Sequence, residues 1–206
     1  MSIYALKGRF QALLRPAVGG LFRRGITANA VTLAAAVVSL LVAAALWRWA
    51  PAQPLLYLAL PGWMLLRMAL NAIDGMLARE FGQQSRLGAY LNELCDVVAD
   101  AALYLCLLSA PGVAAAALWA LAWTAALSEY AGVLGLMVGA SRRYDGPMGK
   151  SDRAFVIGVL GLLLALGWAG GTVVNGVAVA MAALCVATLW RRVRQGLREA
   201  AAMPRG

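Results

Sequence analysis

Long apolar stretches separated by short polar connections make up most of this 206-residue chain. About 20 consecutive apolar residues are needed for an α-helix to cross the hydrocarbon core of a bilayer. Stretches that approach this length occupy residues 28–47, 53–73, 92–110, 112–138, 154–170 and 172–190. The pattern therefore predicts an all-α integral membrane protein with six transmembrane helices.

A different pattern precedes the first apolar stretch, within residues 5–25. Four apolar residues there are spaced to lie on one face of a helix, namely Leu6, Phe10, Leu13 and Leu14. Basic residues fall elsewhere on the same helix. This spacing predicts a short amphipathic helix that lies on the membrane surface and precedes the six spans. A loosely ordered basic leader is the alternative interpretation.

The composition agrees with a membrane protein, since 63% of the residues are hydrophobic, 13% are charged and the mean hydropathy is +0.76. Soluble domains are nearer about 45–50% apolar and about 25% charged. The net charge of +9 would favour nucleic-acid binding in a soluble protein. Here the basic residues cluster between apolar stretches, so anionic lipid headgroups and membrane topology explain them, and no nucleic-acid partner is expected. The chain contains no histidine, so acid–base chemistry must use carboxylates.

The positions of lysine and arginine predict how the helices are oriented. Basic residues gather before the first apolar stretch, between the second and third, between the fourth and fifth, and after the sixth. By the positive-inside rule, both termini and both basic loops are cytoplasmic, in the cell or inner membrane. We therefore expect a single membrane domain over residues 1–206, with the juxtamembrane helix at 5–25, the spans at 28–190 and a basic cytoplasmic tail at 191–206.

Two of the predicted spans carry a polar face, because residues three or four apart lie on the same side of a helix. The faces consist of Arg67, Asn71, Asp74 and Ala78 from the second span, and of Gly88, Asn92, Asp96 and Asp100 from the third. A polar connection of about a dozen residues lets the two helices pack antiparallel, so we expect these faces to meet near the cytoplasmic surface. Ionisable groups are costly at membrane depth, which makes them functional candidates.

The residue types on these faces suit a phosphate held by a metal ion. Carboxylate and amide oxygens are ligands for hard cations such as Mg²⁺ or Mn²⁺, and magnesium commonly completes its shell with substrate phosphates. Arg79 offers a planar pair of donors that matches phosphate oxygens. Gly75, Ala78 and Gly88 are small enough for a bulky ligand to approach the backbone.

Six of these residues form a motif that resembles the signature D-x2-D-G-x2-A-R-x8-G-x3-D-x3-D of the CDP-alcohol phosphotransferases, also called CDP-alcohol phosphatidyltransferases. The motif consists of Asp74, Gly75, Ala78, Arg79, Gly88 and Asp96. Such a match arises by chance on the order of once in 10⁷–10⁸ start positions. Asn71 and Asn92 stand where the signature has aspartate.

The resemblance implies an enzyme of phospholipid biosynthesis. Members of the family transfer a phosphatidyl or similar substituted phosphate group from a CDP-alcohol, such as CDP-diacylglycerol, to an acceptor alcohol that is in some cases phosphorylated. CMP is the leaving group, and the implied cofactor is Mg²⁺ or Mn²⁺. The implied partners also include membrane lipid and a second copy of the chain in a homodimer.

The resemblance also implies a role for each matching residue. Asp96 is the candidate general base and a metal ligand. The other implied metal positions are Asn71, Asp74 and Asn92. The residues implied to contact the CDP group are Asp74, Gly75, Ala78, Arg79 and Gly88, together with Asn29 and Thr32. The last two lie in a short element that resembles the family's T-P-N-x-x-T sequence, with Ala28 in place of the proline.

The two asparagines remove two negative charges from the predicted metal site, although each amide keeps one oxygen as a possible ligand. Glu93 and Asp100 are spaced to share the helical face of Asp96. We therefore expect Asp100 or Glu93 to restore charge to the site, with Asp100 included among the metal ligands. A buried acid paired with an arginine is the alternative for Asp100.

A second basic loop leads into the fifth apolar stretch. The resemblance implies that basic residues here bind the phosphate of a phosphorylated acceptor, and the candidates are Lys150, Arg153 and Arg142. A loop that is basic for reasons of topology alone is the alternative. Asp152 is spaced to cap the helix that follows.

Glu129 lies inside the fourth apolar stretch. An acid at this depth is more often part of a structural pair between helices than a catalytic group. Arg67 is the candidate partner, because it also lies in the middle of a predicted span.

Two other classes of function fit part of the pattern. A catalytically weak or inactive relative that binds CDP-lipid, or that serves as a membrane partner subunit, is compatible with the two asparagines. A small transporter would explain acids within the membrane, but it would not explain small residues and an arginine at the signature spacing.

Overall fold

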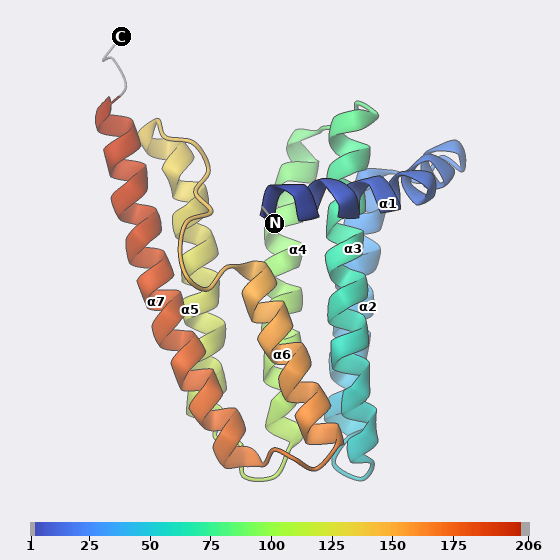
Figure 1. Ribbon diagram of the computed structural model, residues 1–206, viewed down its shortest axis with the longest axis vertical. Helices are drawn as coiled ribbons and strands as arrows, with labels where there is room; N and C mark the ends of the chain where they lie inside the picture. The colour runs from blue at the N-terminus through green and yellow to red at the C-terminus, as the bar shows by residue number, and fades with distance from the viewer. Residues whose placement is uncertain (1–2, 203–206) are drawn as a thin grey trace.

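The computed structural model describes residues 3–202, which form α-helices joined by short turns and three 3₁₀ segments (Figure 1). In chain order the elements are α1 (Ile3–Arg23), α2 (Ala28–Trp49), η1 (Pro54–Leu58), α3 (Ala59–Glu80), α4 (Arg86–Leu105), η2 (Cys106–Ser109), α5 (Ala115–Leu134), η3 (Gly135–Val138), α6 (Lys150–Ala165) and α7 (Gly171–Ala202). The predicted all-α fold is confirmed.

Helices α2 to α7 run along the long axis of the molecule, and α1 crosses that direction (Figure 1). Helix α2 packs against α3 and α4, α3 packs against α6, and α5 packs against α7. The helix predicted at residues 5–25 is therefore present as Ile3–Arg23. The side chains of Leu6, Lys7 and Arg9 lie outside the described residues, and the position of α1 on a membrane surface stays a prediction.

Within residues 3–202, four helical segments are long and apolar enough to cross a membrane: Ala28–Trp49, Pro54–Glu80, Ala115–Val138 and Gly171–Ala202. Helix α4 is less apolar because it carries the acids of the signature, and α6 has only 16 residues. The chain is thus an integral membrane protein by the length and composition of its helices, and the count of six spans stays a prediction.

Apolar residues fill the interior between α4, α5, α6 and α7. The fully buried side chains at the centre include Leu103, Leu107, Leu118, Leu121, Ile157 and Val174. Large apolar side chains also cover the outside of the bundle, including Leu41, Trp123 and Val179. An apolar exterior of this extent is unfavourable in water and is typical of a surface that faces lipid.

A second apolar cluster fixes the amino-terminal helices near the signature. Val18 of α1 packs with Val31 of α2 and with Met76 and Leu77 of α3. The polar connection between α3 and α4 is short, spanning only residues 81–85, because both helices extend well into the signature. All fixed positions of the signature from Asn71 to Asp96 consequently lie on a helix, either α3 or α4.

Side chains near the signature define where two helices begin. The hydroxyl of Ser85 accepts a hydrogen bond from Gly88 N at 2.9 Å at the start of α4. At the start of α6, the carboxylate of Asp152 accepts one from Gly149 N at 2.9 Å, which confirms the predicted cap. Such caps satisfy backbone N–H groups that have no partner within the helix.

Candidate functional site

One side chain, that of Arg67, joins the polar faces of α3 and α4. The prediction that these two helices pack against each other is wrong, because each packs against α2 and they make little direct contact. Arg67 of α3 donates to the carboxylate of Asp96 at 3.2 Å and forms an ion pair with Asp100 one turn further along α4. Arg67 is almost completely buried, so this cation replaces its water shell with the two carboxylates. The pairing holds the two signature helices together at the depth of the candidate site.

Asp74 lies where α3 meets the start of α2. Its carboxylate accepts a hydrogen bond from the hydroxyl of Thr32 at 2.8 Å, and only 5% of the residue is exposed. The Thr32 hydroxyl is itself held close to the backbone oxygen of Ala28 at 3.1 Å. The backbone N–H of Ala28 donates to the side chain of Gln83 at 2.7 Å, which ties the start of α2 to the connection between α3 and α4.

Asn29 lies against the first turn of α4. A Cβ atom at position 88 would come within 2.7 Å of the Asn29 Oδ1 atom, so only glycine leaves space for this side chain. The structure therefore brings Asn29 and Thr32 together with Asp74 and Gly88, four residues that the sequence groups as CDP contacts.

Arg79 lies at the exposed end of this group. Its guanidinium folds back over Gly75, where a Cβ atom would be only 2.9 Å from the Nη2 atom. Among residues 3–202, no carboxylate lies within ion-pair distance of Arg79. Its donors are thus available to an anion that approaches between α3 and α4.

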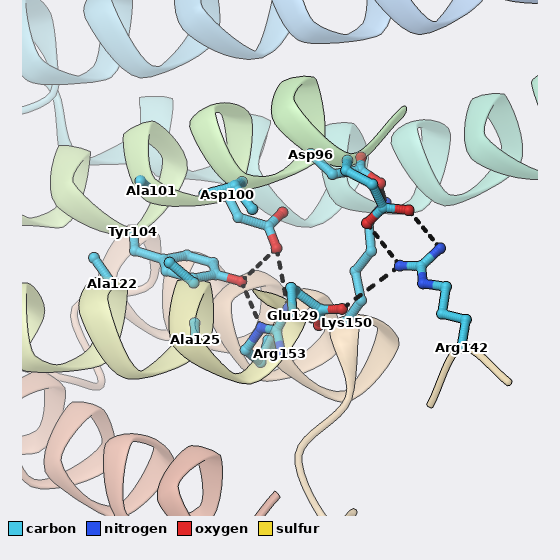
Figure 2. Close-up of a pocket in the computed structure, with 13 residues that line it drawn as sticks. Asp96, Asp100, Ala101, Tyr104, Ala122, Ala125, Glu129, Arg142, Lys150 and Arg153 are labelled. Atoms are coloured by element: carbon cyan, nitrogen blue, oxygen red, sulfur yellow. Dashed lines mark hydrogen bonds and ion pairs between the residues drawn. The ribbon is translucent and has the colours of Figure 1, made fainter. Parts of the chain in front are cut away.

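Asp96 and Asp100 differ in their surroundings. Asp96 is partly exposed and forms ion pairs with Lys150 of α6 and with Arg67. Asp100 is buried and forms an ion pair with Arg67. Its carboxylate also contacts Arg153 at 3.4 Å and the hydroxyl of Tyr104 at 3.0 Å (Figure 2). Asp100 thus has the contacts of a buried acid paired with arginines, while its assignment as a metal ligand stays a prediction.

Glu129 of α5 pairs with helices α6 and α7. Its carboxylate accepts from Arg153 at 2.8 Å and from Arg192 at 3.1 Å. The prediction that Glu129 pairs with Arg67 is wrong, because α5 packs against α7, while Arg67 is satisfied by the acids of α4. The expectation of a pair between helices is confirmed with these other partners.

A small cavity lies where α4, α5 and the start of α6 come together (Figure 2). Its charged lining consists of Glu93, Asp96, Asp100, Glu129, Arg142, Lys150 and Arg153. The cavity volume is about 20 Å³, roughly the space of one water molecule. All three basic residues that the sequence predicts for an acceptor phosphate therefore line one cavity, together with Asp96.

These three basic residues are not equally accessible. The side chain of Arg153 is 0% exposed and contacts Glu129, Asp100, Tyr104 and the backbone oxygen of Met148. Arg142 and Lys150 are about one quarter exposed. Arg142 pairs with Glu93 at 2.6 Å and stacks over the ring of Tyr144, with its Cζ atom 4.7 Å from the ring centre.

The charges around the cavity form one connected set, which we call the central ion-pair network. It consists of Arg67, Glu93, Asp96, Asp100, Glu129, Arg142, Lys150, Arg153 and Arg192. Five basic and four acidic side chains leave one formal positive charge. The network therefore satisfies its own acids and retains a small preference for an anion.

The 139–149 connection is held by residues that no motif in the sequence indicated. Arg143 pairs with Glu199 near the end of α7, and Glu199 also accepts from Ser141 N and Oγ at 3.0 Å each. Arg143 N donates to the backbone oxygen of Gly132 at 3.0 Å, where a Cβ atom would come within 2.7 Å of Arg143 O. In the sequence, the feature that points to this contact is Glu199, an acid that stands alone among the basic residues at 191–206. The anchor fixes the connection that carries Arg142.

The candidate oxygen donors at the signature positions of α3 and α4 are two carboxylates and two amides, a set that suits one hard divalent cation. Among the described residues, no three His, Cys, Asp or Glu side chains lie together as a metal group. Asp74 shares a helical face of α3 with Asn71, and Asp96 shares a face of α4 with Asn92. The amide nitrogen of Asn92 donates to Glu93 at 3.3 Å, so its oxygen remains available. Two carboxylates with amide oxygens match the usual protein share of a magnesium shell.

Residues 25–190 match the family model described as CDP-alcohol phosphatidyltransferase. The chain is 47% identical over 166 residues to the inner membrane protein YnbA of Escherichia coli K12, covering 81% of this chain and 82% of that protein. It is 32% identical over 98 residues to a phosphatidylinositol phosphate synthase of Mycobacterium marinum, covering 48% of this chain and 40% of that one.

The fold is similar to that of the phosphatidylinositol phosphate synthase of Mycobacterium tuberculosis. The crystal structure of that protein in complex with manganese and citrate gives a TM-score of 0.74, with 23% identity over 93% of this chain and 92% of that chain. Its structure with CDP-DAG bound gives a TM-score of 0.69 at 23% identity, covering 92% of this chain and 94% of that one. At this level of identity, the likeness shows a shared fold.

Proposed function

Because this chain belongs to the CDP-alcohol phosphatidyltransferase family, we propose that it transfers the substituted phosphate group of a CDP-alcohol, such as CDP-diacylglycerol, to an acceptor alcohol. One observation carries the proposal. Arg79, which has no acidic partner among the described residues, and the carboxylate of Asp74 lie on α3, and Arg67 joins α3 to Asp96 of α4, which in turn pairs with Lys150 of α6. A diphosphate and an acceptor hydroxyl can therefore be bound next to each other.

The diphosphate is assigned to the side of the site formed by α2, α3 and the first turn of α4. Arg79 donates to phosphate oxygens, and its planar donor pair suits two of them. Gly75 leaves space for the Arg79 guanidinium and Gly88 leaves space for the Asn29 side chain, and Ala78 lies one turn from Asp74 on the same face. Thr32 keeps the Asp74 carboxylate pointed toward the diphosphate side by its hydrogen bond.

The acceptor hydroxyl is assigned to the neighbourhood of Asp96. In the reaction, the hydroxyl oxygen forms a bond to the phosphorus that carries the transferred group, the bond from that phosphorus to the CMP oxygen breaks, and CMP leaves. Asp96 accepts the hydroxyl proton as general base. Lys150 lies against Asp96 and is the nearest cation for a phosphate on the acceptor, with Arg142 beside it. Arg153 is fully buried, so it orients Asp100 and Glu129 behind the cavity.

A divalent cation, Mg²⁺ or Mn²⁺, would be held by Asp74 and Asp96 with the amide oxygens of Asn71 and Asn92. When bound, such an ion stabilises the negative charge of the diphosphate and of the leaving group. The fit rests on the oxygen donors named above and on the usual binding of magnesium by one or two carboxylates plus substrate phosphates. Asp100 is less suited to this role because it is both buried and paired with two arginines, whereas Asp96 is partly exposed and Asp74 has no cationic partner among the described residues.

The placement in the membrane follows the distribution of charge. We assign six spans to residues 28–190, the α1 helix to the membrane surface and the basic residues at 191–206 to the cytoplasmic side, as one membrane domain. On this topology the diphosphate side and both termini are cytoplasmic, where water-soluble CMP can leave. A homodimer is the assembly expected for the family.

The test is release of CMP from CDP-diacylglycerol by the purified full-length protein, with a panel of phosphorylated and unphosphorylated acceptors and with Mg²⁺ or Mn²⁺. We expect release with at least one acceptor, loss of release with EDTA, and loss in Asp96→Asn. Glu80→Gln is the matched control, since Glu80 is an acid at the end of α3 that pairs only with exposed Arg15 among the described residues. Tight binding of CDP-diacylglycerol without release by any acceptor would favour a non-catalytic lipid binder.

A further inference from the structure

A second hollow lies on the outer side of α7, away from the central ion-pair network. It is lined by Asp145 and Gly146 of the 139–149 connection and by Trp190, Arg191, Arg194, Gln195 and Arg198 of α7. Its cavity volume is about 380 Å³, many times that of the cavity beside Asp96. It is large enough for a polar headgroup with its bound water.

The arginines of this hollow share one side of α7. At about 100° per residue, Arg191, Arg194 and Arg198 fall within roughly 60° of the helix circumference. Arg192 lies on the opposite side, where it is 2% exposed and binds Glu129 and the backbone oxygen of Ser128 at 2.6 Å. The helix therefore separates one structural arginine, turned inward, from three arginines that line the hollow.

The three outward arginines have no acidic partner in the described part of the chain, since no carboxylate lies within ion-pair distance of any of them. Asp145 is the acid that lines the hollow, and its carboxylate is taken by Arg143 at 2.8 Å. Three like charges close together are unfavourable without a counter-charge. The hollow therefore has an unmatched preference for an anion.

The depth of the hollow in the membrane favours a lipid headgroup. The apolar part of α7 runs from Gly171 to Trp190, about 30 Å at 1.5 Å per residue, which matches the hydrocarbon thickness. Trp190 is exposed at its end, the position that tryptophan prefers at a membrane interface. The arginines begin at the next residue, so they stand at the level of lipid phosphates.

From these observations we propose that Arg191, Arg194 and Arg198 form a binding site for the headgroup of an anionic phospholipid. The phosphate oxyanion is the recognised chemistry, with Trp190 packed beside the glycerol and upper acyl region. The site is separate from the CDP-alcohol site, and it does not depend on catalysis. Because Asp145 and Gly146 line the hollow, a bound lipid would contact the 139–149 connection as well as α7.

The proposal is tested on the full-length protein in detergent, using native mass spectrometry to count bound lipid from an equimolar mixture of phosphatidylglycerol and phosphatidylcholine. The wild-type protein should retain phosphatidylglycerol in preference. The variant Arg191→Gln/Arg194→Gln/Arg198→Gln should weaken that binding by roughly a hundredfold, since each basic residue near an anionic lipid surface contributes about fivefold. The matched control removes three other exposed basic residues, Arg23→Gln/Arg24→Gln/Arg86→Gln.

The control separates a defined site from diffuse surface charge. An equal loss of phosphatidylglycerol in both triple variants, or no loss in the α7 variant, would overturn the proposal. A second arm adds sodium phosphate or sodium chloride at equal ionic strength. We expect equal displacement of lipid by the two salts, while selective displacement by phosphate would show that the hollow takes free phosphate instead. Brominated phosphatidylglycerol should quench the tryptophan fluorescence of the wild-type protein more than that of the Trp190→Phe variant. Equal quenching in the two proteins would contradict a lipid site beside Trp190.

Discussion

The two sides of the candidate site differ in how completely the protein satisfies its own charges. On the diphosphate side, Arg79 has no carboxylate partner among the described residues, and Asn71 and Asn92 add oxygens without charge. On the acceptor side, Asp100, Glu129 and Arg153 are buried in mutual ion pairs around a cavity with room for about one water molecule. The first side can bind a ligand with the charges it has, whereas the second must be rearranged to admit one.

This contrast indicates which residues act on a substrate and which support the helices. A buried charge that loses its partner destabilises a protein strongly, because the remaining charge has neither water nor a counter-ion. An exposed arginine that loses its guanidinium costs little in stability and acts on ligand binding instead. The same type of residue, arginine, should therefore give opposite results at positions 79 and 153.

The largest effect is expected from Arg153→Met. The substitution leaves Asp100 and Glu129 without a shared counter-ion, so we expect a loss of about 3–5 kcal/mol in unfolding free energy. The measurement is unfolding of the purified protein in a denaturing detergent titration. Arg23→Met is the control, because Arg23 is exposed and its loss should leave the midpoint unchanged. An unchanged midpoint in Arg153→Met would mean that the network does not support the fold.

Arg79→Ala should affect binding rather than stability. Loss of a charge-assisted contact with the diphosphate should raise the KM for the CDP-alcohol by roughly tenfold to a hundredfold, with the unfolding midpoint unchanged. Arg79→Lys keeps the charge but loses the planar donor pair, so it should recover only part of the affinity. Steady-state kinetics with varied CDP-alcohol measures both variants. A raised KM for the acceptor alone would place Arg79 on the other side of the site.

The double variant Asn71→Asp/Asn92→Asp sharpens the role of the diphosphate side. It restores two negative charges to the proposed oxygen ligands, so the concentration of Mg²⁺ or Mn²⁺ that gives half-maximal CMP release should fall by roughly tenfold. Titration of metal at saturating substrates measures this change. The single variant Glu80→Gln provides the control. Unchanged metal dependence in the double variant would remove the two asparagines from the metal site.

The smallest effect is expected from Glu199→Gln, which loosens the 139–149 connection. Glu199 holds Ser141 and Arg143, and that connection carries Arg142 to the cavity. We expect the KM for the acceptor to rise roughly threefold to tenfold, with the KM for the CDP-alcohol unchanged. Glu199→Asp should restore part of the effect. A parallel change in both KM values would indicate a general loss of structure.

Helix positions and polar faces followed from the sequence because periodicity and charge are local properties. Spacing alone placed Asp74 with Ala78 on one face and Asp96 with Asp100 on another, and Arg67 does join the two helices. The partner of Glu129 could not be read in this way, because it depends on which helices are neighbours. Spacing gave no sign of Arg192 as a buried residue, since an arginine just beyond an apolar stretch has the same appearance whether it faces lipid or protein.

Segments far apart in the chain were the least predictable. The Arg143–Glu199 pair joins residues separated by 56 positions, and its geometry depends on the close approach allowed by Gly132 and Gly135. Neither glycine belongs to a recognisable motif, and both lie within or next to an apolar helix. The Arg143–Glu199 pair could therefore not be predicted without knowing that α5 packs against α7.

The most direct test compares one chemical change on the two sides of the site, Asp74→Asn and Asp100→Asn, by CMP release per folded molecule. The amide introduced by Asp74→Asn would still accept the Thr32 hydrogen bond but would lack the negative charge. The account predicts that Asp74→Asn keeps the wild-type unfolding midpoint and loses at least about a hundredfold in CMP release. Asp100→Asn should instead lower the unfolding midpoint. Wild-type CMP release by Asp74→Asn, with unchanged metal dependence, would contradict the account.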